Sequence, residues 1–394
     1  MANNSSMWRR NKHPKPWWGM VAVLGIFLAA ALPMGEESGE RSGPIDERAT
    51  KATKALYYNL HQLSGKKVLF GQEDALAYGV EWKTWHKSRS DVKDVCGMHP
   101  ALVGWEMSKL GQGEYNIDSV NFQHMKSWMK EVYKMGGVNT LSWHMDNFVT
   151  GGDSWDVGEK VVKTILPGGT NHEAYKKKLD LFADYVRSLK VGFLFKKQIP
   201  IIFRPFHEHT GSWFWWGRSH CTPEEYKSLW RFSVDYLRNE QQLHNILYCY
   251  STDIFQDEAD YLEFYPGDEY VDILGMDDYH DLSVKGKSGD LVKRLRMLVQ
   301  MAEVRGKVPA FSETGQEAIP EERWWTNRLL EPIKSDSIAS RIAYMMVWRN
   351  ARKDHHYGPY PSHQSAADFK SFSEDQWLIF EGRIPELYRI PKGK

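Results

Sequence analysis

The sequence of 394 residues contains only three cysteines, Cys96, Cys221 and Cys249. Three is an odd number, so at most one disulfide can form, and the fold does not depend on a disulfide framework. None of the three belongs to a C-x-x-C pair, and their spacing does not match a metal site. The cysteine content therefore excludes the small disulfide-rich folds and gives no support for a structural metal ion.

The chain also lacks an excess of charge of either sign. Lysine and arginine total 51, aspartate and glutamate total 51, and the formal net charge is zero. Nucleic-acid-binding proteins usually carry a basic excess, so we expect no nucleic-acid partner. Hydrophobic residues make up 42% of the sequence, which is a globular composition, and the length allows one large domain or two ordinary ones.

The N-terminus has the pattern of an export signal. Four basic residues between positions 9 and 15 precede the apolar run GMVAVLGIFLAAALPMG, which has small residues towards its end. The run is short for a membrane span, and no cysteine follows it to carry a lipid. We therefore predict a signal peptide or membrane anchor over residues 1–35, with cleavage near Ala31. A polar linker over 36–47 then leads into a secreted or periplasmic folded domain over 48–394.

Eight short apolar runs recur along this domain. They cover residues 67–74, 100–107, 137–145, 199–209, 245–253, 271–279, 308–315 and 343–350. Continuous apolar runs are typical of parallel strands that are buried on both faces. Amphipathic stretches separate the runs and predict helices over 173–189, 288–305 and 321–334, with a further helix that begins at the capping box of Thr222 and Glu225. Eight strands alternating with helices predict a single (β/α)8 barrel.

A doubly wound open sheet is the alternative α/β fold. That fold usually has a glycine-rich phosphate loop after its first strand, and FGQEDALAYG at this position has none. The barrel is therefore favoured, and in a barrel the catalytic groups lie at the C-terminal ends of the strands. We expect one cleft to be lined by the polar and aromatic residues that end the runs: Glu73, Asp74, Glu106, His144, His207, Glu208, Asp253, Asp277, Tyr279, Glu313, Trp348 and Arg349.

Two of these strand ends carry glutamates that stand out, Glu208 after the fourth run and Glu313 after the seventh. Either one alone could merely pair with an arginine. A pair of carboxyl groups across a cleft, one protonated and one ionised, can cleave a glycosidic bond. The chain contains 17 tryptophans, two groups of which form the clusters WFWWG (213–217) and RWW (323–325). A buried indole N–H needs a hydrogen-bond partner, so we expect more than core packing to explain these clusters. We interpret WFWWG as a wall on which the apolar face of a sugar stacks beside the proton donor.

The histidines that flank Glu208 in HEH do not have the spacing of a metal site. On a strand, His207 and His209 point to one side and Glu208 to the other. A zinc protease instead needs H-E-x-x-H on a helix, and the acidic pair at 277–278 has no calcium-binding loop around it. We therefore predict no metal and no cofactor.

Three further residues are placed to support the glutamates. Asp277 and Tyr279 end the sixth run on one face of the strand. A Tyr279 hydroxyl that donates to Glu313 would keep this carboxylate ionised and aligned. Arg204 lies four residues before Glu208 and would add positive charge nearby.

The stretches RPFHEHTGSWFWWG, MDDYH, FSETG and VWRN resemble the motifs of glycoside hydrolase family 26, the β-mannanases. SWHMDN and GQEDALAYG are also similar to that family, so the resemblance extends over residues 46–394. It implies a (β/α)8 catalytic domain that hydrolyses β-1,4-linked mannosides with retention of configuration. Retention requires carboxyl groups about 5–5.5 Å apart, against about 6.5–9.5 Å for inversion.

The resemblance also implies a role for individual residues. Glu208 matches the acid/base and Glu313 the nucleophile. His207 matches a residue that supports the two carboxylates, and Tyr279 matches the hydrogen-bond donor to the nucleophile. The residues implied to contact sugar are His144 and Trp348 at the cleavage point, Trp213 on the leaving side, and Trp155 along the cleft.

Two alternatives remain open at this point. The same fold and mechanism can act on xylan or mixed-linkage glucan, because the loops rather than the strand ends select the sugar. A secreted carbohydrate-binding protein without catalysis would use the same aromatic cleft, although it would not need both glutamates. We expect a monomer whose partner is β-mannan polysaccharide or manno-oligosaccharides.

Overall fold

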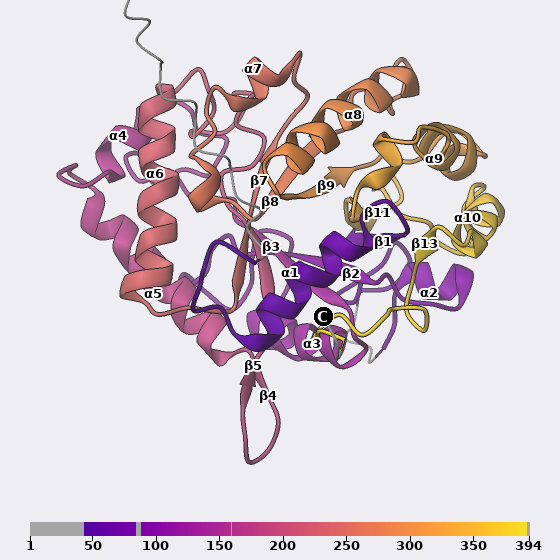
Figure 1. The fold of residues 1–394 in the computed structure, drawn as a ribbon, viewed down its shortest axis with the longest axis horizontal. Helices are drawn as coiled ribbons and strands as arrows, with labels where there is room; N and C mark the ends of the chain where they lie inside the picture. The colour runs from indigo at the N-terminus through magenta and orange to yellow at the C-terminus, as the bar shows by residue number, and fades with distance from the viewer. Residues whose placement is uncertain (1–42, 84–87, 159, 392–394) are drawn as a thin grey trace, which may run out of the picture. The chain divides into compact units, whose positions relative to one another are not determined.

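The computed structural model describes residues 43–83, 88–158 and 160–391. Eight parallel strands close into a barrel: β1 (Val68–Glu73), β2 (Leu102–Glu106), β3 (Val138–Ser142), β6 (Ile201–Arg204), β7 (Ile246–Thr252), β8 (Ile273–Asp278), β9 (Val308–Thr314) and β10 (Tyr344–Val347). The barrel closes because β10 pairs with both β9 and β1, which places Leu69 opposite Tyr344 at the seam. Each strand lies within one of the eight predicted runs, so the (β/α)8 barrel is confirmed (Figure 1).

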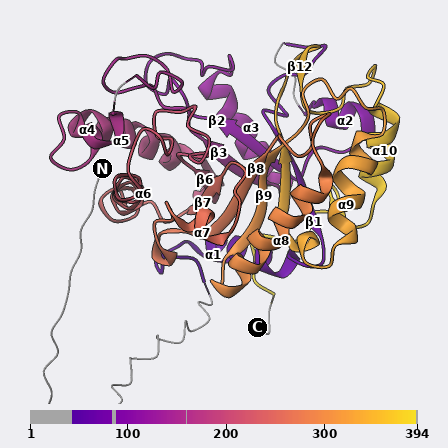
Figure 2. The ribbon, with the colours of Figure 1, turned by 90° about the horizontal axis from the view of Figure 1, so that it is seen from above.

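Helices surround the barrel (Figures 1 and 2). They are α1 (Lys51–Leu63), α2 (Asp91–Cys96), α3 (Phe122–Lys134), α4 (Val161–Ile165), α5 (His172–Ser188), α6 (Pro223–Asp235), α7 (Glu258–Leu262), α8 (Ser288–Val304), α9 (Glu331–Ser335) and α10 (Ala366–Glu374). The predicted helices α5, α6 and α8 are present, and α6 begins with the predicted capping box. The segment 321–334 is not one α-helix, because a π-helical turn (Trp324–Leu330) leads into α9, where Pro332 has no amide hydrogen to continue the bonding pattern.

The remaining strands are short and lie outside the barrel ladder or at its edge. β4 (Lys190–Val191) pairs with β5 (Lys197–Gln198), and β11 (Asn350–Arg352) pairs with β12 (His355–His356), both antiparallel. β13 (Leu378–Ile379) adds to β1 in parallel. The first of these hairpins immediately precedes β6 and so lies at the edge where the barrel strands begin.

Helix α1 closes the end of the barrel at which the strands begin. Leu56 and Leu60 pack in one buried cluster with residues near the starts of the strands, among them Leu69, Leu102 and Ile202. Figure 1 shows α1 lying across this mouth. A larger apolar cluster fills the space between strands and helices. Because α1 covers one end, the opposite end, where the strands stop, is left to present polar side chains to a cleft.

The end of the predicted linker packs on the barrel. The Ile45 amide donates to an Asp272 carboxylate oxygen at 2.8 Å, and the Asp46 carboxylate lies 2.7 Å from Nδ1 of His244. The predicted signal segment 1–35 and the first part of the linker lie outside the described residues. Among those that are described, no helix is long and apolar enough to cross a membrane.

Most of the clustered tryptophans belong to the core. Trp215 and Trp216 of WFWWG and Trp324 and Trp325 of RWW are fully buried. Each indole N–H donates to a carbonyl or hydroxyl oxygen 2.8–3.2 Å away, which removes the cost of burying it. The interpretation of WFWWG as a sugar-stacking wall is therefore wrong for Trp215 and Trp216, and the RWW tryptophans, Trp324 and Trp325, are core residues. Trp213, at the start of WFWWG, has 36% of its surface exposed.

Candidate active site

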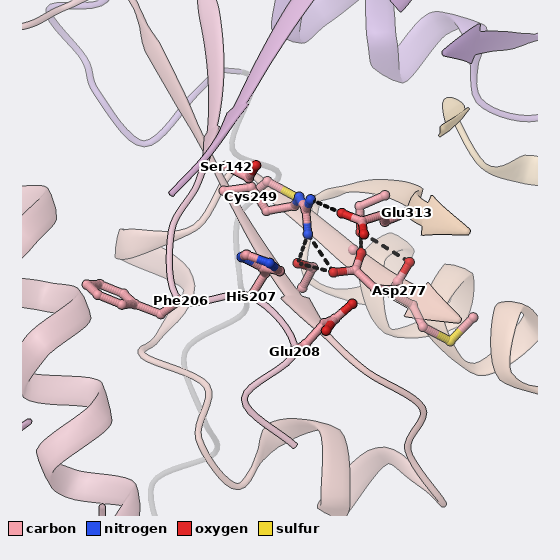
Figure 3. A network of polar contacts seen from close by, with 12 residues as sticks. Ser142, Phe206, His207, Glu208, Cys249, Asp277 and Glu313 are labelled. Carbon is pink, nitrogen blue, oxygen red and sulfur yellow. Dashed lines mark hydrogen bonds and ion pairs between the residues drawn. The ribbon is translucent and has the colours of Figure 1, made fainter. Parts of the chain in front are cut away.

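The HEH triplet lies in a turn after β6 rather than on the strand. β6 ends at Arg204, and the backbones of Phe206 and Glu208 are left-handed, with φ of 49° and 54°. The expectation that the two histidines point to one side and Glu208 to the other, as on a strand, is therefore wrong. In Figure 3, His207 and Glu208 point towards a polar network, whereas Phe206 points away from it.

Three hydrogen bonds hold this turn. The Glu208 amide donates to the carbonyl of Ser251 at 3.1 Å, which ties the turn to β7. The Tyr226 hydroxyl and the Trp216 indole each donate at 2.8 Å to the carbonyls of Phe206 and His207, respectively. Left-handed backbone costs about 1–3 kcal/mol at a residue other than glycine, and it persists only where its surroundings fix it. The buried part of WFWWG therefore contributes to the site by positioning Glu208.

Arg204 is buried at the centre of the network and contacts two carboxylates. Its Nη1 lies 2.5 Å from Oδ2 of Asp277, and its Nη2 contacts Oε2 of Glu313. The Ser312 hydroxyl donates to the other Asp277 oxygen at 2.7 Å. Burial lowers the pKa of Arg204, but the two carboxylates outweigh it and raise the pKa well above its usual value. The permanently charged guanidinium thus binds the carboxyl groups of Asp277 and Glu313 at the same time.

The second oxygen of Glu313 accepts the predicted hydrogen bond from Tyr279. The distance from the Tyr279 hydroxyl to Oε1 is 2.6 Å. Burial, and then the Glu313 carboxylate, raise the pKa of Tyr279 well above its usual value, so the phenol keeps its proton at neutral pH. With one oxygen held by Arg204 and the other by Tyr279, the carboxylate is fixed in orientation.

Glu208 has a different environment. Burial raises its pKa well above the usual value, and the nearby carboxylates of Glu313 and Asp277 raise it further. Its Oε2 accepts a hydrogen bond from the Trp213 indole at 2.8 Å. The site therefore contains one carboxyl group with a raised pKa and a second one bound by an arginine, and such unequal environments suit acid-assisted nucleophilic attack.

His144 is held by Glu106, to which the sequence analysis gave no individual role. Glu106 accepts from the His144 amide at 2.8 Å and lies 2.7 Å from its Nδ1, and Ser142 donates to the same carboxylate at 2.9 Å. Burial lowers the pKa of His144, but Glu106 outweighs burial and raises it. The His207 ring meets the His144 ring edge-on at 4.7 Å, and burial, followed by the charge of Arg204, lowers the pKa of His207 and keeps it neutral.

The predicted aromatic residues gather beside these histidines. The Trp155 ring stacks on the His144 ring with centroids 5.1 Å apart and planes 10° apart, and 48% of its surface is exposed. The half-buried Trp348 has its ring 6.3 Å from that of His144. Trp213, which is partly exposed, lies against Glu208, so the three predicted aromatic residues contact either His144 or Glu208.

A polar cluster continues beyond Trp348. Arg349 contacts Asp118 at 2.9 Å and the Tyr78 hydroxyl at 3.2 Å, and Tyr78 donates to Asp74 at 2.8 Å. Arg349, Asp118 and Tyr78 border a cavity of about 450 Å³. Asp118 follows no predicted strand, so sequence periodicity gave no signal for it. In the described part of the chain, no three acidic, histidine or cysteine side chains are arranged to hold a metal ion.

Removing the Tyr279 hydroxyl tests how much the orientation of Glu313 matters. A hydrogen bond to a charged group contributes about 1.5–3 kcal/mol, so Tyr279→Phe should reduce kcat of the glycoside hydrolysis that the motifs imply by about 10- to 100-fold. Tyr388→Phe is a matched control, because it removes a 2.6 Å hydrogen bond to the Gly137 carbonyl away from the strand ends. Equal kcat values for wild type and Tyr279→Phe would contradict the role given to this phenol.

The sequence model of glycosyl hydrolase family 26 matches residues 45–329 of this chain. The chain belongs to glycosyl hydrolase family 26. The resemblance of its motifs is therefore confirmed. The (β/α)8 barrel described above is thus the fold of a family 26 protein.

Individual relatives agree with the family assignment. A mannan endo-1,4-beta-mannosidase of Bifidobacterium adolescentis is 34% identical over 387 residues, which covers 90% of this chain and 38% of that relative. The structure of a family 26 beta-mannanase from Bacteroides ovatus superposes with a TM-score of 0.81 at 41% identity, covering 88% of this chain and 99% of that one. The catalytic domain of a family 26 endo-beta-1,4-mannanase from Bacillus sp. JAMB-750 gives a TM-score of 0.82 at 34% identity, with 88% and 95% covered.

Proposed function

We propose that this family 26 protein is a retaining β-mannanase that hydrolyses β-1,4-mannosidic linkages in mannan, glucomannan or galactomannan. The observation that carries the proposal is the unequal pair of glutamates. Burial and neighbouring carboxylates raise the pKa of Glu208, whereas Arg204 and Tyr279 contact the two oxygens of Glu313 and fix its orientation. Such a pair supplies both the acid and the nucleophile of glycoside hydrolysis.

In the first step, Glu313 attacks the anomeric carbon while Glu208 gives its proton to the glycosidic oxygen. The bond to the leaving sugar breaks and an ester bond to Glu313 forms. In the second step, Glu208, now ionised, takes a proton from water, whose oxygen displaces Glu313 from the same carbon. Two inversions at one carbon give net retention, and both glutamates return to their starting states.

The surrounding residues position the sugar and the two carboxyl groups. His144 and Trp348 would contact the sugar at the cleavage point, and Trp155 and Trp213 would stack on neighbouring sugars. His207, Arg204 and Asp277 would act through the glutamates. The proposal for mannan as substrate is supported by the names of the relatives, which are mannan endo-1,4-beta-mannosidases and beta-mannanases.

The proposal includes location and assembly. The basic and apolar pattern within residues 1–35 supports export to the periplasm or the medium. The catalytic domain would then work as a monomer over residues 48–394.

The test is reducing-sugar release from linear β-mannan, glucomannan, galactomannan, xylan and lichenan. Strong release from the mannans is expected, and NMR of the first product should show the β-anomer, as retention requires. Release confined to xylan or lichenan would keep the mechanism but replace the substrate. Binding to mannan without release from any polysaccharide would support the non-catalytic alternative, and an initial α-anomer would contradict retention.

A further inference from the structure

The β4–β5 hairpin projects from the edge of the barrel where the strands begin. Its two strands pair antiparallel, with Lys190 opposite Gln198 and Val191 opposite Lys197. Gly192 has a φ of 100°, and a Cβ there would lie 2.5 Å from the carbonyl oxygen of Phe195, so the tight turn requires glycine. In Figure 1 the hairpin extends as a finger away from the helices and strands of the barrel.

The tip of this hairpin is apolar and exposed. Phe193, Leu194 and Phe195 follow one another in the chain, and 94%, 81% and 84% of their surfaces are accessible. A single exposed apolar residue needs no explanation, but three large ones at the end of a projection form a contiguous surface that water solvates poorly. The backbone pairing of β4 with β5 holds the hairpin without any contribution from these side chains, so their apolar character is not needed for the fold.

Cations surround the base of the hairpin. The adjoining groove, of about 1030 Å³, is lined by six basic residues and one acidic residue: Lys51, Lys134, Lys190, Lys196, Lys197, Arg389 and Glu386. Arg389 pairs with Glu386 at 3.9 Å. Across residues 43–83, 88–158 and 160–391, no carboxylate forms an ion pair with any of the five lysines. The net charge of the whole chain is zero, so this basic excess is a local property of the hairpin edge.

We propose that this surface, comprising the Phe193–Phe195 tip and the lysines at its base, docks on an anionic lipid bilayer. The apolar tip enters the boundary between headgroups and acyl chains, and the lysines remain at the level of the phosphates. Each lysine near such a surface gains electrostatic attraction, which salt screens. The depth of insertion is limited to the tip, because the paired strands behind it carry the charged residues.

The combination of tip and charge favours a bilayer over other occupants. A neutral polysaccharide offers no counter-charge for the five lysines. A second copy of this chain would bring two basic surfaces together, and the repulsion would oppose the contact between tips. An anionic bilayer satisfies both features at once, because it presents negative charge directly above an apolar interior.

Docking at this edge leaves the candidate active site open. The hairpin precedes β6, whereas Arg204 ends that strand and the turn that carries Glu208 follows it, so the two features lie at opposite ends of the barrel wall. The protein would thus be held at a membrane surface with its cleft accessible to polysaccharide. This inference does not depend on the substrate, because it rests on residues that the mechanism does not use.

The first test is flotation of the full chain with phosphatidylcholine vesicles that contain or lack phosphatidylglycerol. Wild type should bind the anionic vesicles more tightly. The triple variant Phe193→Ser, Leu194→Ser and Phe195→Ser should bind them on the order of 100-fold more weakly. Lys190→Gln, Lys196→Gln and Lys197→Gln together should weaken binding by a similar factor at low salt only. Unchanged flotation of both variants would overturn the proposal.

A site-specific probe separates the hairpin from any binding through residues 1–42. An environment-sensitive dye on Leu194→Cys should shift to the blue with anionic vesicles and be quenched by lipids labelled in the acyl chain. The same dye on Val284→Cys, exposed in the loop after β8, should show neither effect. A dye at position 194 that stays in water would overturn the proposal even if the chain floats.

The remaining outcomes are also decisive. Sedimentation without lipid that shows a dimer in wild type and a monomer in the serine variant would assign the tip to self-association instead. Mannan hydrolysis should be the same for wild type and the serine variant, because the tip lies away from the cleft. A loss of both hydrolysis and thermal stability would indicate a structural role for the tip and contradict docking.

Discussion

Replacing Glu313 with alanine is expected to reduce kcat on linear β-mannan by about 10⁵-fold, which corresponds to about 7 kcal/mol of transition-state stabilisation. The loss is large because, among the described residues, no other carboxylate in the site is held by both a guanidinium and a phenol. No neighbouring carboxylate can therefore take over the attack. Glu263→Ala is the control, since this exposed carboxylate pairs with Arg218 at 3.0 Å and is not part of the proposed mechanism.

Azide distinguishes loss of the nucleophile from general damage. In Glu313→Ala the vacated space admits a small anion on the face from which Glu313 attacked, while Glu208 still protonates the leaving oxygen. Azide should therefore restore turnover of an aryl β-mannoside and give the α-mannosyl azide, by one inversion. A β-azide product from this variant would exchange the roles of the two glutamates. Circular dichroism should match wild type, because Arg204 keeps its contact with Asp277.

The sequence was sufficient for the barrel because its strands are buried on both faces. A strand in that position must be apolar throughout, so runs such as 271–279 stand out without any homologue. The C-terminal ends of those runs then placed Glu208, Asp277 and Glu313 near one another, since parallel strands in a closed barrel end on the same face. The apolar runs and their spacing are thus enough to predict the barrel and the residues that face its cleft.

The errors occurred where the backbone leaves regular structure. On a regular strand, successive residues of the HEH triplet would point to alternate faces, but the left-handed backbones of Phe206 and Glu208 break this alternation. No sequence signal marks these two positions, because neither residue is glycine. The WFWWG cluster suggested a sugar-binding surface, yet burial depends on whether each indole N–H finds an acceptor. Those acceptors, such as the carbonyl of His207, come from segments brought close only by the fold.

Two other features also depend on tertiary contacts. Glu106 ends a predicted strand, but its bond to His144 is set by the pairing of β2 with β3, which periodicity alone does not reveal. From the sequence alone, the apolar triplet Phe193–Phe195 would be placed in the hydrophobic core. Only the position of the hairpin, outside the layer of helices, shows that these side chains are exposed.

Replacing Glu208 with glutamine should separate the two steps of the reaction. On mannan, whose leaving sugar needs protonation, kcat/KM should fall by about 10³- to 10⁴-fold, because general acid catalysis is lost. An aryl mannoside with a strongly acidic phenol needs no proton, so its first step should change by about tenfold or less. Glu263→Gln is again the control. A loss of equal size on both substrates would contradict the role of Glu208 as the acid.

The pH dependence supplies a second, independent measurement. Burial and neighbouring carboxylates raise the pKa of Glu208, and the acid must be protonated to act, so wild-type kcat/KM on mannan should fall as pH rises through that raised pKa. Glu208→Gln should lack this alkaline limb. The same raised pKa means that the folded chain binds this proton more tightly than the unfolded chain does. As pH rises above about 4.3, the pKa of a glutamate in the unfolded chain, Glu208 therefore lowers the free energy of unfolding. The variant should therefore be at least as stable as wild type at neutral pH, and a lower melting temperature would show that its inactivity reflects unfolding.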